Sequence, residues 1–142
     1  MFFTVFVVGM VVNMFNRKFL GAGGGGAPAP ATIVYNSNYD STSQVSGNFT
    51  FSSANIGSAD PSRVVLIAAS CLQGVSLGNI GVTVGGVPAT LVTHTTTNPI
   101  AMGLFRINVP SGTTSTIVLQ ANDAGNPVEA SIGIFSMYNS VC

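Results

Sequence analysis

The stretch Arg63-Val-Val-Leu-Ile-Ala-Ala-Ser-Cys71 decides the fold of this chain. It holds four large apolar residues in succession, Val64 to Ile67, and two alanines follow them without a charge. A run this short and rich in β-branched residues, with Pro61 before it and Gly74 after it, favours a strand over a helix. Because both of its faces are apolar, we expect this strand to be buried on both sides.

Outward from this segment, the sequence predicts shorter strands separated by turns of Gly, Pro, Asn and Ser. We expect about eight strands, at residues 32–36, 48–53, 63–71, 82–84, 87–92, 100–109, 116–120 and 131–141. Such strands, with turn signals every 8–12 residues or so, are typical of an all-β, antiparallel β-sandwich of jelly-roll or immunoglobulin-like type. No window keeps a 3.6-residue apolar period, so helix should be nearly absent from the folded domain. The segment 37–47 is predicted to be a loop, and 72–80 a loop or an irregular strand.

Alternation within three of these strands predicts which side chains share a face. Residues 48–53 alternate, with Phe49 and Phe51 on one face and polar side chains on the other. In the strand at 100–109, Met102 and Leu104 lie on one face, and Gly103 and Phe105 on the other. In the last strand, Gly133, Phe135 and Met137 lie on one face, and Ile132, Ile134 and Ser136 on the other.

The clearest local signal is the pair Gly85-Gly86 between two apolar runs. A tight type I′ hairpin requires a positive φ at both turn residues, and glycine adopts it without steric cost. Pro88 has no N–H, so the returning strand 87–92 is predicted to be an edge strand or to have its N–H side facing outward. Residues 93–98 would be a polar, threonine-rich extension of it.

The N-terminal part of the chain is predicted to stand apart from the β domain. Residues 1–20 form an apolar arm, 21–30 a Gly/Ala/Pro linker, and 31–142 the sandwich. The arm has three readings: a signal or anchor, an interaction arm, or a start placed too early, with Met14 as the true one. No positive charge precedes its apolar run, which is shorter than the roughly 20 residues of a membrane-spanning helix. As an interaction arm, it would place at an interface Phe2, Phe3, Phe6, Phe15, Phe19 and Leu20.

Charge is scarce in this chain. Four basic and four acidic residues make up 6% of the sequence, against about 25% in an average protein. Nucleic acid is a poor partner for such a chain, because binding phosphates needs clustered Lys or Arg. Little charge, 17 glycines and many Ser, Thr and Asn residues instead indicate a protein that works within an assembly.

No set of residues predicts catalysis, a cofactor or a metal site. His94 is the only histidine, and a Ser-His-Asp arrangement would require it to meet Asp40, Asp60 or Asp123. The four acids, which include Glu129, are scattered in or beside loops, where turn-forming roles are expected. A calcium site at Asn122-Asp123 or at Asp60 is conceivable, but no ligand spacing supports it.

Two further features are weak signals. Asn48-Phe-Thr50 matches a glycosylation acceptor, but it falls within a predicted strand. Cys71 is expected to behave as a small buried apolar group. A disulfide between Cys71 and Cys142 is an alternative that the sequence leaves open.

Several segments together resemble the small β domains of structural proteins in tailed phages and prophages. They are Met14-Phe-Asn-Arg-Lys-Phe-Leu-Gly with the glycine run, Phe49-Thr-Phe-Ser-Ser, Ser62-Arg-Val-Val-Leu-Ile-Ala, Val82-Thr-Val-Gly-Gly-Val-Pro-Ala-Thr, Val109-Pro-Ser-Gly-Thr and Ile132-Gly-Ile-Phe-Ser-Met-Tyr. The resemblance implies a virion component, either a capsid decoration (cement) protein or a tail-associated module. Its partners would be other virion proteins and further copies of itself, with no nucleic acid and no membrane in the mature assembly.

A second resemblance, over residues 82–120, is to immunoglobulin-like IPT/TIG modules. The shared features are the hairpin Val82-Thr-Val-Gly-Gly-Val-Pro-Ala-Thr and the later Val109-Pro-Ser-Gly. This resemblance implies a cell-surface adhesive or carbohydrate-binding module with a similar sandwich. Such a module would need an exposed aromatic platform, for which the available tyrosines are Tyr35, Tyr39 and Tyr138.

Overall fold

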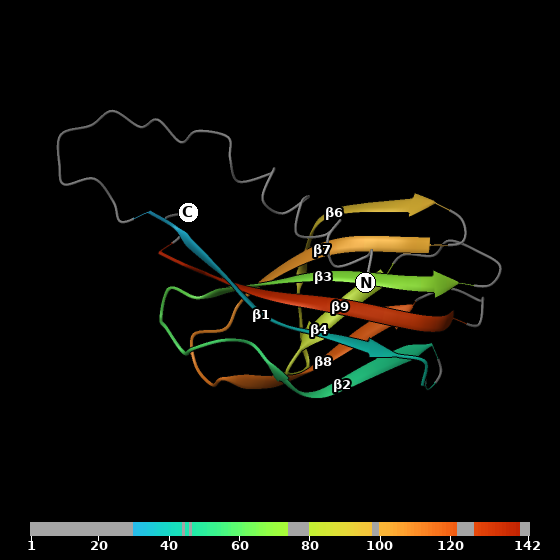
Figure 1. Ribbon diagram of the computed structural model, residues 1–142, viewed down its shortest axis with the longest axis horizontal. Coiled ribbons are helices and arrows are strands. Elements are labelled where there is room, and N and C mark those ends of the chain that lie inside the picture. The colour runs from blue at the N-terminus through green and yellow to red at the C-terminus, as the bar shows by residue number, and fades with distance from the viewer. Residues whose placement is uncertain are drawn as a thin grey trace. The chain divides into compact units, whose positions relative to one another are not determined.

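The computed structural model describes residues 30–43, 45, 47–73, 80–97, 100–121 and 127–139. Within these residues the chain forms nine antiparallel strands in two sheets, and no helix, so none could cross a membrane (Figure 1). The predicted all-β sandwich is therefore confirmed. Outside the described residues lie the predicted arm and its interface residues Phe2, Phe3, Phe6, Phe15, Phe19 and Leu20, most of the linker, and Asn122, Asp123 and Cys142.

The two sheets differ in size. The five-stranded sheet has the spatial order β1 (Thr32–Ser41), β9 (Pro127–Tyr138), β3 (Val64–Gln73), β7 (Ile100–Asn108) and β6 (Thr90–Thr97). The four-stranded sheet has the order β2 (Asn48–Asn55), β8 (Thr114–Ala121), β4 (Ile80–Val84) and β5 (Val87–Pro88). Contacts join β1 to β2 and β7 to β4, so β1 lies over β2 on one side of the sandwich, and the edge strands on the other side are β6 and β5.

Strand β3 lies at the centre of the larger sheet, as its sequence predicts. Every residue from Val64 to Cys71 is buried, with at most 8% of its surface exposed. Alternate residues, among them Ile67, belong to the core between the sheets. On the other face, Leu66 lies opposite Phe135 of β9, and this large cross-strand neighbour helps to bury the Leu66 side chain.

The core between the sheets is built from the alternating faces that the sequence predicts. Phe49 and Phe51 of β2 are buried in it, together with Phe105 of β7 and alternate residues of β9. Met102, Leu104 and Phe135 are on the opposite face of the larger sheet, outside this core. Period-two alternation therefore assigns the two faces correctly in β2, β7 and β9.

The hairpin at Gly85-Gly86 is confirmed, but the strand after it is not continuous. Both glycines have positive φ, +58° and +82°, and β5 lies at the edge of the smaller sheet. The predicted strand 87–92 is wrong, because β5 ends at Pro88 and the chain crosses to the larger sheet as β6. The backbone N–H of Ala89 makes the last hydrogen bond to β4, at 2.8 Å from the oxygen of Val82.

The predicted loop 37–47 is also wrong in its first half, because β1 continues to Ser41. It pairs with β9 over its whole length, with a register shift between Tyr35 and Ser37. At a sheet edge much of a strand faces water, so a polar sequence can pair without an apolar pattern. Elsewhere strand ends differ by a few residues: β3 reaches Gln73, β8 is Thr114–Ala121, and β9 is Pro127–Tyr138.

Candidate interaction surface

The side of the sandwich formed by β1 and β2 is closed by hydrogen bonds between the two sheets. The Ser37 hydroxyl donates to the carbonyl oxygen of Asn55 at 3.1 Å. The backbone N–H of Asn55 donates to the hydroxyl of Tyr39 at 3.0 Å, and the Tyr39 ring packs near that of Phe51. We refer to this side, β1 with β2, as the closed side.

Arg63 holds the loops at one end of the sandwich together. The residue is 1% exposed and immediately precedes β3. Its five N–H groups reach five carbonyl oxygens at 2.7–2.9 Å, and a sixth, that of Ile56, lies at 3.4 Å. The five acceptors belong to Gly57, Ser58, Val109, Ser111 and Gly112.

This set of bonds compensates the cost of burying the charge of Arg63. A guanidinium has five donors in a rigid fork, and each of them is matched by an acceptor here. Burial of a cation is costly unless it is hydrogen-bonded, and six carbonyl dipoles with their negative ends towards it reduce that cost. Arg63 therefore links the loop before β3 to the turn between β7 and β8.

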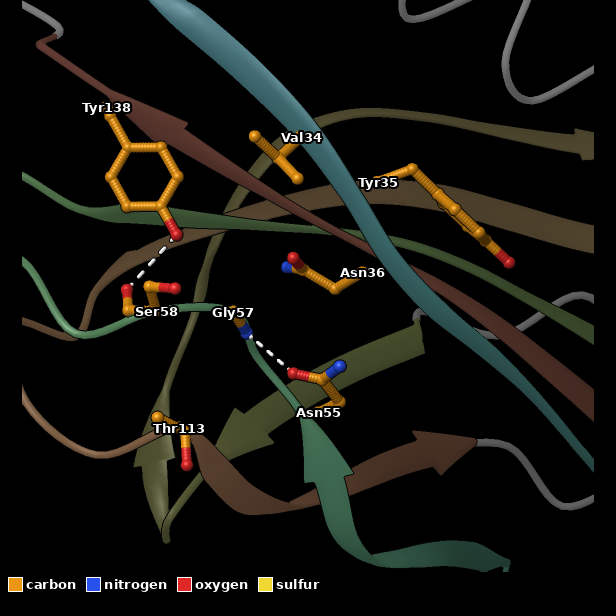
Figure 2. Close-up of a pocket in the computed structure, with 8 residues that line it drawn as sticks. All are labelled: Val34, Tyr35, Asn36, Asn55, Gly57, Ser58, Thr113 and Tyr138. Atoms are coloured by element: carbon orange, nitrogen blue, oxygen red, sulfur yellow. Dashed lines mark hydrogen bonds between the residues drawn. The ribbon is translucent and has the colours of Figure 1, made fainter.

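A hollow of about 500 Å³ lies beside these loops on the closed side. Figure 2 shows Val34, Asn36 and Tyr138 around it on the strand side, with the loop residues Gly57 and Ser58 facing them. Asn55, Thr113 and Tyr35 complete its lining, although the Tyr35 ring points away from the group.

The polar groups that line this hollow form hydrogen bonds mainly with other residues of the same chain. The Asn36 amide donates to the hydroxyl of Ser136 at 2.7 Å, and Ser136 in turn donates to the oxygen of Ile56 at 2.6 Å. The Tyr138 hydroxyl donates to Ser58, and the Asn55 side chain accepts the N–H of Gly57. These hydrogen bonds join the loop that follows β2 to β9, which indicates a structural role for the residues around the hollow.

The three tyrosines do not share one platform. Tyr35 packs on Phe135, with 5.4 Å between ring centroids, on the outer face of the larger sheet. Tyr39 packs against the core between the sheets, and Tyr138 lines the hollow. The exposed aromatic platform that an adhesive module would need is not assembled from these residues.

The opposite side of the sandwich, β5 with β6, is open. Leu91 pairs with Phe105 and His94 with Gly103, so both lie on the face of the larger sheet that is turned towards the smaller one. Both are nevertheless exposed, because β6 is an edge strand and β5, the edge strand of the smaller sheet on this side, has only two residues. The larger sheet thus extends beyond the smaller one at β6.

Exposed apolar residues occur on the two edge strands of this open side, β5 and β6, and at the start of β7. Val87, Leu91, Val92 and Ile100 are 40–58% exposed, and they are four of the seven large exposed hydrophobic residues in the described part of the chain. With His94 they form what we name the β6 rim. The strand itself, Thr-Leu-Val-Thr-His-Thr-Thr-Thr, carries no formal charge at neutral pH and no proline. The rim is therefore the candidate interaction surface.

The residues considered for chemistry are separated in space. His94 is on β6 and Asp40 on β1, which are the opposite edges of one sheet. Asp60 lies in the turn before β3, where hydrogen bonds from the Ser62 hydroxyl and N–H lower the pKa of its carboxyl. It has the expected turn-forming role. No cluster of three metal-binding side chains occurs among the residues that the structure describes.

The remaining candidates have structural positions. Cys71 is a free thiol near the end of β3, and burial raises the pKa of this thiol to about 11. Asn48 is the first residue of β2, where its backbone pairs with Val45. Glu129 lies on β9 opposite Leu72.

Sequence reasoning missed both Arg63 and the β6 rim. Arg63 was predicted only as the start of the central strand, since its carbonyl partners leave no mark in the sequence. A usable signal was the threonine-rich run after Pro88, which has neither charge nor proline to protect an edge.

Comparisons with known proteins give one distant likeness. No protein-family model and no curated protein matches the chain. Among solved structures, a chain of the "Cyanophage Pam1 capsid asymmetric unit" is similar, with 18% sequence identity and a TM-score of 0.42. The match covers 86% of this chain and 94% of that chain.

Proposed function

We propose that this protein is a structural subunit of a bacteriophage virion and that it acts by protein–protein contact. The observation that carries the proposal is the β6 rim. It combines an open strand edge with exposed apolar side chains, and natural proteins seldom leave such an edge unprotected unless it has a partner. The sequence resemblance to small β domains of phage structural proteins supplies the kind of assembly.

The low charge of the chain supports a role in an assembly. A free protein with formal net charge zero and 6% charged residues lacks the electrostatic repulsion that keeps subunits apart. In an assembly the same surface is an advantage, because burying it costs little desolvation of charge. Each buried apolar Å² contributes roughly 25 cal/mol before the costs of association are subtracted.

In finer terms, we propose a capsid decoration (cement) or tail-associated subunit that forms homo-oligomers. The apolar residues 1–20 would supply a second contact to neighbouring virion proteins. The protein would need no cofactor and carry out no catalysis, since its contribution is contact area. Its location would be the virion.

The test is whether the protein is a stoichiometric part of purified particles. Virions of the phage that encodes it would be banded by density, disrupted, and quantified by mass spectrometry against the major capsid protein. We expect a fixed copy number per particle, and antibody labelling in electron micrographs would then distinguish head from tail. Abundant protein in the lysate with none in the particles would overturn the proposal.

A further inference from the structure

We propose that two copies of this chain pair through β6, antiparallel, so that their five-stranded sheets continue into one sheet. This inference rests on the proposed function and deepens it, because it names the partner of the β6 rim as a second copy. Three steps carry it: the state of the other edges, the regularity of β6, and its fit to itself.

The other three edges in the described part of the chain are each protected. Strand β5 has two residues, one of them Pro88, so it offers almost no ladder. Strand β2 is interrupted between Phe51 and Ala54, where Ser53 has a φ of +53°. Strand β1 has a register shift between Tyr35 and Ser37 and carries a charged residue, Asp40. Bulges, charges and short strands are the usual means of preventing edge pairing.

Strand β6 has none of these protections over most of its length. Its own register shift lies between Leu91 and Thr93, and from Thr93 to Thr97 it pairs with β7 without interruption. In an antiparallel ladder, about half of the N–H and C=O groups of an edge strand point away from its neighbour. Those of Thr93–Thr97 are available to a further strand.

This segment is complementary to itself about a two-fold axis. With the axis at its middle residue, Thr95 of each copy faces Thr95 of the partner subunit, and Thr93 faces Thr97 of the partner subunit. No like charges are opposed, and a pair of threonines such as Thr95 with Thr95 of the partner subunit stabilises neighbouring strands. A closed two-fold contact of this kind uses the same patch on both copies.

Part of the apolar rim lies next to this contact. Leu91 and Val92 directly precede the paired segment and are 42% and 44% exposed in the single chain. A second copy paired along Thr93–Thr97 would remove part of their surface from water. Ile100 lies on β7 and on the face of the larger sheet opposite to that of Leu91, so it takes no part in this contact.

Disulfide trapping in the full-length protein tests the pairing. In a Cys142→Ser background, Thr95→Cys would bring two thiols together across the axis. Opposed residues of antiparallel strands have Cα atoms about 4.5–5.5 Å apart, within the range of a disulfide. We expect mild oxidation to give a covalent dimer and no larger product, because Cys71 is buried. The matched control is Asn38→Cys, on the β1 edge.

Light scattering on the same proteins separates this inference from the proposed function. We expect Thr95→Lys to weaken self-association by at least about tenfold, because it places like charges opposite each other, while Asn38→Lys has little effect. A wild-type protein that is monomeric at all concentrations would overturn both the pairing and the homo-oligomer. An oligomer that survives Thr95→Lys, with no more trapping at position 95 than at 38, would overturn the pairing alone. The rim would then bind another occupant, such as the N-terminal arm or a different protein.

Discussion

The two sides of the sandwich differ in how their edge strands are protected. On the closed side, β1 and β2 are joined by side-chain hydrogen bonds, and the loops beside them are fastened by Arg63. On the open side, β5 stops after two residues and β6 extends past it with exposed apolar side chains. The core therefore lies between one side that is closed by bonds within the chain and one side that leaves an edge strand and apolar side chains exposed.

In a small, weakly charged β domain, this difference separates the residues that stabilise the folded monomer from those that are available for association. A chain of this size has few charges with which to protect its edges, so it uses bulges, loops and internal bonds on one side. The open side contributes little to the folded monomer, because its side chains are already in water. Substitutions of exposed side chains on the open side should therefore leave the stability of the monomer almost unchanged, whereas substitutions on the closed side should reduce it.

The largest effect is expected at Arg63, on the closed side. Arg63→Ala would remove five part-buried hydrogen bonds to carbonyl oxygens, of which that of Ser58 would keep the Tyr138 hydroxyl as a donor, and should reduce the free energy of unfolding by roughly 3–5 kcal/mol. Urea denaturation followed by circular dichroism measures the change. Arg63→Lys is the control, because lysine keeps the charge but has only three donors, so its loss should be intermediate. A loss below about 1 kcal/mol for Arg63→Ala would contradict the role given to these bonds.

A smaller effect is expected from a matched pair of glycines, one on each side. Gly57 and Gly86 have nearly the same φ, +83° and +82°. A Cβ at Gly57 would lie 2.6 Å from the Ser136 hydroxyl and 2.8 Å from the Asn36 side chain, whereas one at Gly86 would meet nothing within 4 Å. Gly86→Ala should therefore cost about 1–2 kcal/mol for the backbone alone.

Gly57→Ala should cost more than Gly86→Ala, because the closed side has no room for the methyl group. The difference between the two midpoints of urea unfolding isolates this crowding from the backbone strain that the two sites share. Equal losses would show that the loop at Gly57 can move away from β9, and that the closed side is looser than its hydrogen bonds indicate.

Cys71 lies between the two sides, and its thiol reports on the interior in a different way. Burial raises the pKa of the folded thiol to about 11 from an ordinary value near 9. The sign follows from linkage: this contribution to stability is complete below pH 9 and is lost as the pH rises towards 11, because the unfolded thiol ionises first. Stability measured from pH 8 to 11 should fall less steeply in Cys71→Ala than in the wild type. Equal slopes for the two proteins would contradict a raised pKa of the Cys71 thiol in the folded state.

The sequence predicted those parts of the fold that depend on local pattern. The burial of β3, the positive φ of both hairpin glycines, and the faces of β2, β7 and β9 follow from composition and period two. Two segments were wrong because partners remote in sequence decide them. Residues 37–41 are a strand because β9 pairs with them, and the crossing at Ala89 depends on where the smaller sheet ends.

The candidate surface was less predictable than the fold. Arg63 bonds to carbonyl groups as much as 49 residues away, and backbone acceptors carry no residue identity that a sequence could reveal. Exposure at Leu91 depends on the length of β5, which is a property of the other sheet. Both features therefore required the tertiary arrangement, although the uncharged run of threonines was visible from the start.

The smallest effects are expected from one substitution on each side that removes little buried volume. Tyr39→Phe deletes the hydroxyl that accepts the Asn55 N–H on the closed side, and it should cost about 0.5–1.5 kcal/mol, the net value of one hydrogen bond. Leu91→Thr, on the open side, changes a side chain that is 42% exposed and should alter the stability of the monomer by no more than about 0.5 kcal/mol.

The informative quantity is how each of these two variants depends on protein concentration. Unfolding of Tyr39→Phe should be destabilised equally at low and high concentration, because the lost bond lies within one chain. Leu91→Thr should resemble the wild type when dilute and become less stable than it only where subunits associate, since association adds to stability by mass action. Should Leu91→Thr already be strongly destabilised in the dilute monomer, the open side would be holding the single chain together, and the distinction between the two sides would fail.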